Sequence, residues 1–273
     1  MLAGVTEMSL LALMHDVPLW FVAIVVTVVA EVYSVGLMLL ARYAYGVSRL
    51  SLNNEVAGFK FAVVGVFYAV LLAFVVIAVW ETYTSTERAV RNEAKAVVDL
   101  QHVVQALPVD GSADISKHLI GYIESVPANE WPSMAVGKAS EIVTDDLNGL
   151  SAAIFALQPE GQRDLALYRH ALRLLTLVTD NRNERLDSSG GSVPVILWVV
   201  LILGGAITLG YPAFFASSNL GAQVLMTAAL AALVAMSLIL GLAFDFPFTG
   251  NPHISAEPFR QALEQMLASL KSP

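Results

Sequence analysis

The chain has 273 residues, of which 56% are hydrophobic and only 14% are charged, and its mean hydropathy is +0.66. This composition excludes a disordered or ordinary soluble protein and is typical of a protein that crosses the membrane several times. The net charge of −8 argues against nucleic acid as a partner. Because the chain has no cysteine, disulfides, thiolate metal sites and cysteine nucleophiles are excluded.

The first apolar run begins close to the amino terminus. Residues 1–16 mix apolar residues with Glu7, His15 and Asp16, and we expect a short interfacial segment there. No basic region precedes the apolar run, so we expect no cleaved signal peptide. Residues 17–41 carry no charge except that of Glu31 and form the first predicted membrane span.

The second span, predicted at residues 59–80, is the stretch around which the chain is organised. Between Lys60 and Glu81 lie 20 residues without a charge. At about 1.5 Å per residue they extend about 30 Å, the thickness of the hydrocarbon core of a bilayer. Because the next proline is Pro108, we expect the helix to continue to about residue 106. Asn53, Asn54 and Glu55 precede the span and are predicted to cap the helix or to line a pore entrance.

Residues 81–187 form a predicted helical domain outside the membrane. They contain 10 of the 15 Lys and Arg residues and 16 of the 23 Asp and Glu residues. Apolar residues recur at helical spacing through 90–107, 114–126, 134–157 and 160–178. Pro127 and Pro132 predict a turn, and Glu130-Trp131-Pro132 is interpreted as a contact within the domain.

The carboxy-terminal part contains two further predicted spans. Residues 188–244 form a run of 57 residues without a charge, which is long enough for spans at 192–212 and 220–244. Both are rich in Gly and Ala, which allow close helix packing in lipid. An amphipathic helix is predicted at 255–270.

The predicted fold is an all-α membrane protein with four transmembrane helices in two pairs and a helical domain between the second and third. Seven basic residues lie near the span ends on the side of the domain, against three on the other side. The positive-inside rule therefore predicts a cytoplasmic domain.

Glu31 is the first candidate functional residue. A carboxylate near the middle of the membrane costs about 2.5 to 3.5 kcal/mol and usually faces protein or water. It is interpreted as a proton or cation site, a pore-lining carboxylate, or a protonated packing residue. Tyr68 is predicted to lie at the same depth, within reach of a hydrogen bond to Glu31.

A second candidate is the seven-residue repeat formed by Lys60, Phe67, Phe74 and Glu81, which share one face of the second span. Around an oligomeric pore these residues would form a basic ring, two aromatic rings and an acidic ring. Alternatively, the aromatic residues pack against other helices and the charges mark the membrane interfaces. The histidines lack metal-ligand spacing, and phosphate-loop and nucleophile motifs are absent, so we expect no enzyme, cofactor or metal site.

Four segments resemble the bestrophin-like domain family of bacterial membrane proteins: NNEVAGFKFAVVGVFYAVLLAFVVIAVWETY at 53–83, EWP at 130–132, RNERLDSSGGSVPVILW at 182–198 and FDFPFTG at 244–250. The resemblance covers roughly residues 50–265. It implies a homo-oligomeric, often pentameric, ion channel of the bacterial inner membrane, whose second span lines the pore and whose usual cargo is chloride or similar anions. Glu31 and the acidic domain leave the permeant ion open.

Two functions other than an ion channel are also compatible with the sequence. One is a membrane-anchored scaffold or sensor whose helical domain binds a protein or a small-molecule signal. The other is a proton-coupled transporter that uses Glu31, although no inverted repeat supports it. The expected partners are the lipid bilayer, further copies of the chain and inorganic ions.

Overall fold

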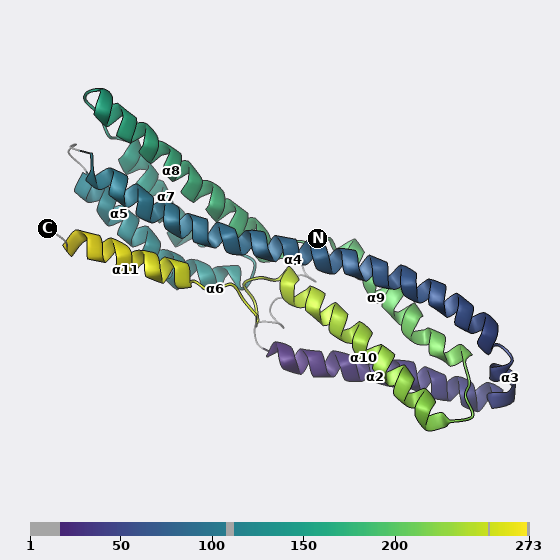
Figure 1. The fold of residues 1–273 in the computed structure, drawn as a ribbon. Helices are drawn as coiled ribbons and strands as arrows, with labels where there is room; N and C mark the ends of the chain where they lie inside the picture. The colour runs from purple at the N-terminus through teal and green to yellow at the C-terminus, as the bar shows by residue number, and fades with distance from the viewer. Residues whose placement is uncertain (1–16, 108–111, 251, 272–273) are drawn as a thin grey trace. The chain divides into compact units, whose positions relative to one another are not determined.

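The computed structural model describes residues 17–107, 112–250 and 252–271, and every regular element within these ranges is helical (Figure 1). The predicted interfacial segment 1–16 lies outside the described residues. The chain divides into two compact units. The membrane unit comprises the described chain up to Glu81 together with Ser192–Asp245, and the inserted domain comprises Thr82–Gly191 and the segment from Phe246 onward.

The membrane unit consists of α2 (Leu19–Tyr45), α3 (Val47–Ser51), the first half of α4 (Asn54–Gln105), α9 (Val195–Gly210), η3 (Tyr211–Phe214) and α10 (Leu220–Asp245). Within the described residues, four helical stretches are long and apolar enough to cross a membrane, namely α2, α4, α10 and the stretch Gln162–Phe214 that contains α9. The predicted all-helical fold with four spans is therefore confirmed.

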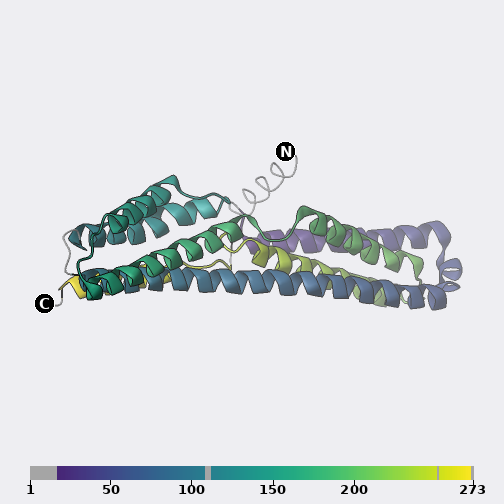
Figure 2. The same cartoon turned by 90° about the horizontal axis from the view of Figure 1, so that it is seen from above.

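Helices α2, α9 and α10 pack alongside one another and alongside the first half of α4 (Figures 1 and 2). The contact between α2 and α9 includes polar side chains that bond to backbone carbonyls. The Ser34 hydroxyl donates to the Leu209 carbonyl at 2.6 Å, and the Tyr33 hydroxyl donates to the Ala206 carbonyl at 3.2 Å. Such bonds satisfy polar groups that the bilayer cannot solvate.

Helix α4 continues without a break from Asn54 to Gln105, so one helix supplies both units. The inserted domain adds α5 (Ser112–Ser125), the π-helix η1 (Val126–Glu130), α6 (Trp131–Met134), α7 (Glu141–Phe155), α8 (Gln162–Asp187), η2 (Ser188–Gly190) and α11 (Glu257–Lys271). Its apolar core is built from the second half of α4 together with α5, α7, α8 and α11. In Figure 1, α11 lies beside α5.

The sequence-based prediction of a turn between Pro127 and Pro132 is wrong. The chain passes from α5 through η1 into α6, and each proline is the second residue of its helix, within the first turn, where a missing N–H is tolerated. The predicted helix at 134–157 is also interrupted. Gly137 has φ of 69°, a conformation that glycine adopts readily, and α7 begins only at Glu141.

Candidate functional site

The membrane-spanning part of α4 has one buried face and one exposed face. Tyr68, Leu72, Val75 and Val79 are buried in the core of the membrane unit. On the rest of the helix surface, all four residues of the predicted seven-residue repeat are exposed: Lys60, Phe67, Phe74 and Glu81. The exposed fractions of Phe67 and Phe74 are 76% and 67%. Phe67 and Phe74 are therefore not packed within the described part of their own subunit, and packing against the helices of a neighbouring subunit stays a prediction.

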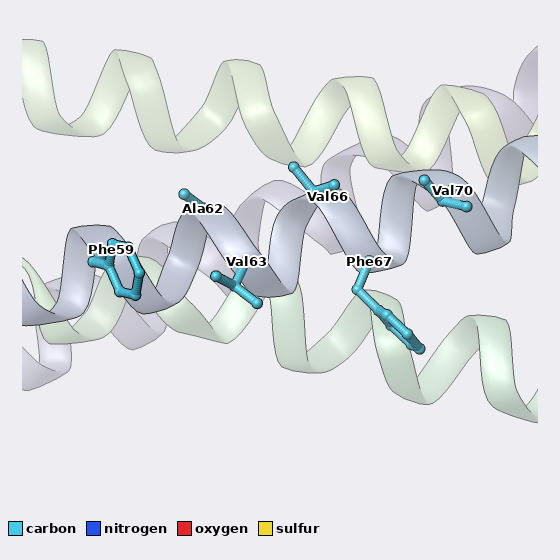
Figure 3. Close-up of a pocket in the computed structure, with 6 residues that line it drawn as sticks. All are labelled: Phe59, Ala62, Val63, Val66, Phe67 and Val70. Atoms are coloured by element: carbon cyan, nitrogen blue, oxygen red, sulfur yellow. The ribbon is translucent and has the colours of Figure 1, made fainter.

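An apolar patch occupies part of the exposed face. It encloses a shallow hollow of about 530 Å³ lined by Phe59, Ala62, Val63, Val66, Phe67 and Val70. Figure 3 shows that all six side chains come from α4, and Phe67 is the one member of the predicted repeat among them. A surface of this kind is available to lipid, to another subunit or to a pore.

Tyr68 does not bond to Glu31. Its hydroxyl donates to the Leu201 carbonyl of α9 at 3.2 Å, and its ring lies so close to Gly204 and Gly205 that a Cβ at either position would meet the tyrosine within 2.9 Å. The glycines of α9 therefore make room for Tyr68 and direct it to α9. Glu31 is half-buried on α2, and no described residue donates a hydrogen bond to its carboxylate.

Asn54 has a different role from the predicted helix cap. Its side-chain amide donates to the Ala216 carbonyl at 2.8 Å, and its side-chain oxygen accepts from the Ala216 N–H at 3.1 Å. This pair of bonds attaches the start of α4 to the connection between α9 and α10. Asn53 and Glu55 beside it are exposed.

The same connection is held by Arg42 at the end of α2. Its guanidinium donates to the Ser217 carbonyl at 2.7 Å and to the Gln223 side-chain oxygen at 3.0 Å. The Gln223 amide in turn donates to the Phe215 carbonyl at 2.9 Å. From the sequence, Arg42 is one of the three basic residues near span ends on the side away from the domain, and nothing in its local sequence indicates these partners.

Asp245 joins α9 and α10 at their other ends. One carboxylate oxygen accepts from the Ser192 N–H at 2.7 Å, the Ser192 hydroxyl at 3.0 Å and the Val193 N–H at 2.9 Å. The other oxygen accepts from the Trp198 indole N–H at 3.1 Å. The buried carboxylate thus satisfies free amides just before α9, where a negative charge is favourable.

Within the inserted domain, a buried ionic cluster joins five side chains from α4, α5, η1 and α8. The Arg185 guanidinium donates to both Glu93 oxygens at 2.8 and 2.9 Å and to Glu130 at 2.7 Å. Arg182 donates to the other oxygen of Glu130 at 2.5 Å, and the Tyr122 hydroxyl donates to Glu93 at 2.6 Å. Arg185, Glu93 and Glu130 are fully buried, so each charge depends on its partners.

Aromatic residues enclose this cluster. The Arg185 guanidinium lies 5.1 Å from the ring centre of Trp131 and 5.6 Å from that of Phe259 on α11. The Trp131 indole donates to the Ile254 carbonyl at 3.0 Å. Trp131 and Phe259 therefore cover the cation with π-faces while Trp131 also attaches the segment before α11.

The cluster shifts the pKa values of Arg185 and Tyr122. Burial opposes the charge of the Arg185 guanidinium, but the adjacent Glu93 and Glu130 carboxylates outweigh burial and raise the pKa of Arg185. Burial and the Glu93 carboxylate raise the pKa of Tyr122 well above its usual value, so the phenol stays protonated and remains a donor. Among the described residues, no group of three His, Asp or Glu side chains is placed to hold a metal ion.

Comparisons with known proteins agree with this architecture. A bestrophin-like domain model matches residues 22–259. A crystal structure of a bacterial bestrophin homologue from Klebsiella pneumoniae with a single substitution superposes with a TM-score of 0.69 at 12% identity, covering 90% of this chain and 99% of that chain. The same homologue solved by zinc anomalous phasing gives a TM-score of 0.66 at 14% identity, covering 90% and 99% of the two chains.

At these identities the superpositions establish the fold alone. The search of curated proteins gave no match. The family model, however, spans most of the described residues, including α4, α9, α10, nearly all of α2 and the buried ionic cluster. The chain therefore belongs to the bestrophin-like domain family of membrane proteins.

Proposed function

We propose that the protein is a homo-oligomeric ion channel whose α4 helices surround the pore. The observation that carries this proposal is the exposed face of α4, on which Phe67 and Phe74 are bounded by Lys60 and Glu81 and are not covered by their own subunit. Membership of the bestrophin-like family supports a channel, and its link to the bestrophins favours anions and a pentamer.

In this proposal the aromatic residues form the narrow part of the pore. A ring of phenylalanines excludes water when the passage is narrow and can gate conduction by dewetting. Lys60 and Glu81 would place rings of opposite charge at the two ends, and Asn53, Asn54 and Glu55 would lie near the entrance before Lys60. The bond of Asn54 to Ala216 would keep that entrance fixed to the rest of the subunit.

We place the protein in the bacterial inner membrane with the inserted domain in the cytoplasm, as the positive-inside rule indicates. The four spans are proposed at 17–41, 59–80, 192–212 and 220–244. Glu31 is proposed as an ionisable group facing the interior of the helix bundle. If Glu31→Gln leaves the current and its dependence on pH unchanged, Glu31 is a packing residue.

Planar bilayers test the channel directly. The purified oligomer should conduct, and Phe67→Ala or Phe74→Ala should increase the open probability or the unitary conductance, because each removes a ring that excludes water. Leu225→Ala is the matched control, since Leu225 is an exposed apolar residue on α10. Well-folded oligomer that carries no current, or phenylalanine variants that behave like the Leu225 variant, would contradict the proposal.

A membrane-anchored scaffold or sensor is the second candidate. It is favoured by the inserted domain, which has an apolar core and an ionic cluster of its own. A defined partner that binds the inserted domain stoichiometrically, with no current from the oligomer, would favour this function over the channel.

A further inference from the structure

The exposed face of α4 continues past Glu81 with the same seven-residue spacing. The positions of this α4 stripe are all exposed: Lys60, Phe67, Phe74, Glu81, Arg88, Lys95 and His102. The first four were identified as a possible pore face, whereas the last three lie in the inserted domain. Phenylalanines are thus replaced by basic side chains along one line of positions.

The burial of α4 follows the same repeat. Every seventh residue in another register is buried: Leu72, Val79, Thr86, Glu93 and Leu100. In a straight α-helix, positions seven residues apart drift by about 20° per repeat. The buried set and the exposed set nevertheless each keep their burial along α4. Arg88 and Lys95 are one repeat apart, so they differ by only about 20° and lie on nearly the same side of the helix.

The acidic residues near Arg88 and Lys95 on α4 do not form ion pairs with these two cations. Glu87 is engaged by Arg91 at 2.8 Å, and Glu93 points inward to Arg185. Asp99 is half-buried, and in the described chain no ion pair holds Arg88 or Lys95.

The rest of the inserted domain carries more acidic than basic residues. Residues 81–187 contain 16 Asp and Glu against 10 Lys and Arg, so a basic line of positions on α4 stands out against an acidic background. Unpaired cations that face water concentrate small anions from solution.

We propose that Arg88 and Lys95 line the aqueous approach to the pore and concentrate small inorganic anions there. The inference rests on the proposed channel function, because the stripe faces a common axis only if α4 surrounds one. Each added subunit places another pair of cations around that axis, and their potentials add. Such a field acts over about 10 Å at 0.1 M salt but only about 3 Å at 1 M.

The test compares Arg88→Gln/Lys95→Gln with wild type in planar bilayers of the full chain. At about 0.1 M KCl the chloride conductance should fall at least about twofold, and the chloride-to-potassium permeability ratio should fall with it. At 1 M KCl the difference should largely disappear. The matched control is Arg163→Gln/Arg169→Gln, which removes two exposed cations from α8.

The outcomes separate the two proposals. If wild type carries no current, the channel proposal fails and this inference fails with it. If wild type conducts, but the α4 and α8 double variants give the same conductance and permeability ratio at both salt concentrations, only the role of Arg88 and Lys95 is overturned. Because both are exposed, size-exclusion profiles and thermal unfolding of the variant should match wild type.

Discussion

The membrane unit and the inserted domain share one helix, α4, but this helix exposes different kinds of side chain in the two units. In the membrane unit α4 buries Leu72 and Val79 and exposes Phe67 and Phe74. In the inserted domain α4 buries Val97 and Leu100 and exposes Arg88 and Lys95. The difference follows the solvent: lipid solvates apolar surface, so apolar exposure is tolerated there, whereas an aqueous domain must close its apolar core.

Polar groups also have different tasks in the two units. In the membrane unit, side chains such as Arg42, Asn54 and Asp245 bond mainly to backbone groups near helix ends. In the inserted domain, Arg185 and Glu93 bond to each other inside the core. Polar side chains thus stabilise the membrane helices near their ends, whereas a buried ion pair stabilises the inserted domain in its core. Substitutions in each unit test this difference.

The largest loss of stability is expected from Arg185→Met. The substitution leaves Glu93 buried without its counter-charge, whereas Glu130 keeps Arg182, and breaking a buried ion pair in this way typically costs about 3 to 5 kcal/mol. Thermal unfolding of the detergent-solubilised protein should shift strongly downward, and limited proteolysis should cut within Thr82–Gly191 before the membrane helices. Arg169→Met, at an exposed position of α8, is the control. Equal shifts for the two variants would show that the cluster contributes little.

A smaller effect is expected from Asp245→Ala, which removes the acceptor for the Ser192 and Val193 amides. Loss of such a cap costs about 0.5 to 2 kcal/mol. Faster hydrogen exchange at these two amides would report the change. Asp245→Asn is the informative comparison, because it retains one acceptor oxygen but turns an NH₂ group toward the Trp198 N–H. It should be intermediate, and an Ala variant as stable as wild type would remove the proposed role of the carboxylate.

The smallest effect is expected from Gly205→Ala. Its Cβ would lie 2.9 Å from the Tyr68 hydroxyl, so we expect a loss of about 1 kcal/mol despite the better helix propensity of alanine. Tyr68→Phe should restore stability in this background. It should not rescue Gly204→Ala, whose Cβ would meet the ring itself. Gly36→Ala is the control, because nothing lies within 4 Å of its Cβ. Thermal unfolding measures each alanine variant, and the Gly204 and Gly205 variants also with Tyr68→Phe; equal rescue of these two by Tyr68→Phe would refute the packing argument.

Much of the fold could be predicted because its signals are local. The charge-free run between Lys60 and Glu81 defines a span by length and composition alone. The repeat of Phe67 and Phe74 predicted a shared face, and both side chains are exposed on it. Their place around a pore stays a prediction, because it depends on neighbouring subunits.

The contacts that the sequence could not indicate join distant segments. Glu93 and Arg185 are 92 positions apart, and each looks like an ordinary surface charge within its own amphipathic helix. Tyr68 was predicted to face Glu31 on depth alone, whereas the space beside Gly204 and Gly205 directs it to α9. The only available signals for the cluster were the EWP and RNER segments, which showed a family resemblance but not that they meet.

The position of Phe259 has a consequence for biosynthesis. This residue completes the enclosure of Arg185, yet it follows α9 and α10 in the chain. During translation Glu93, Glu130 and Arg185 all leave the ribosome before the last hairpin has entered the bilayer. The inserted domain therefore lacks the Phe259 side of its core until that hairpin is integrated. A nascent chain stalled before Phe259 leaves the Arg185 cluster uncovered on that side.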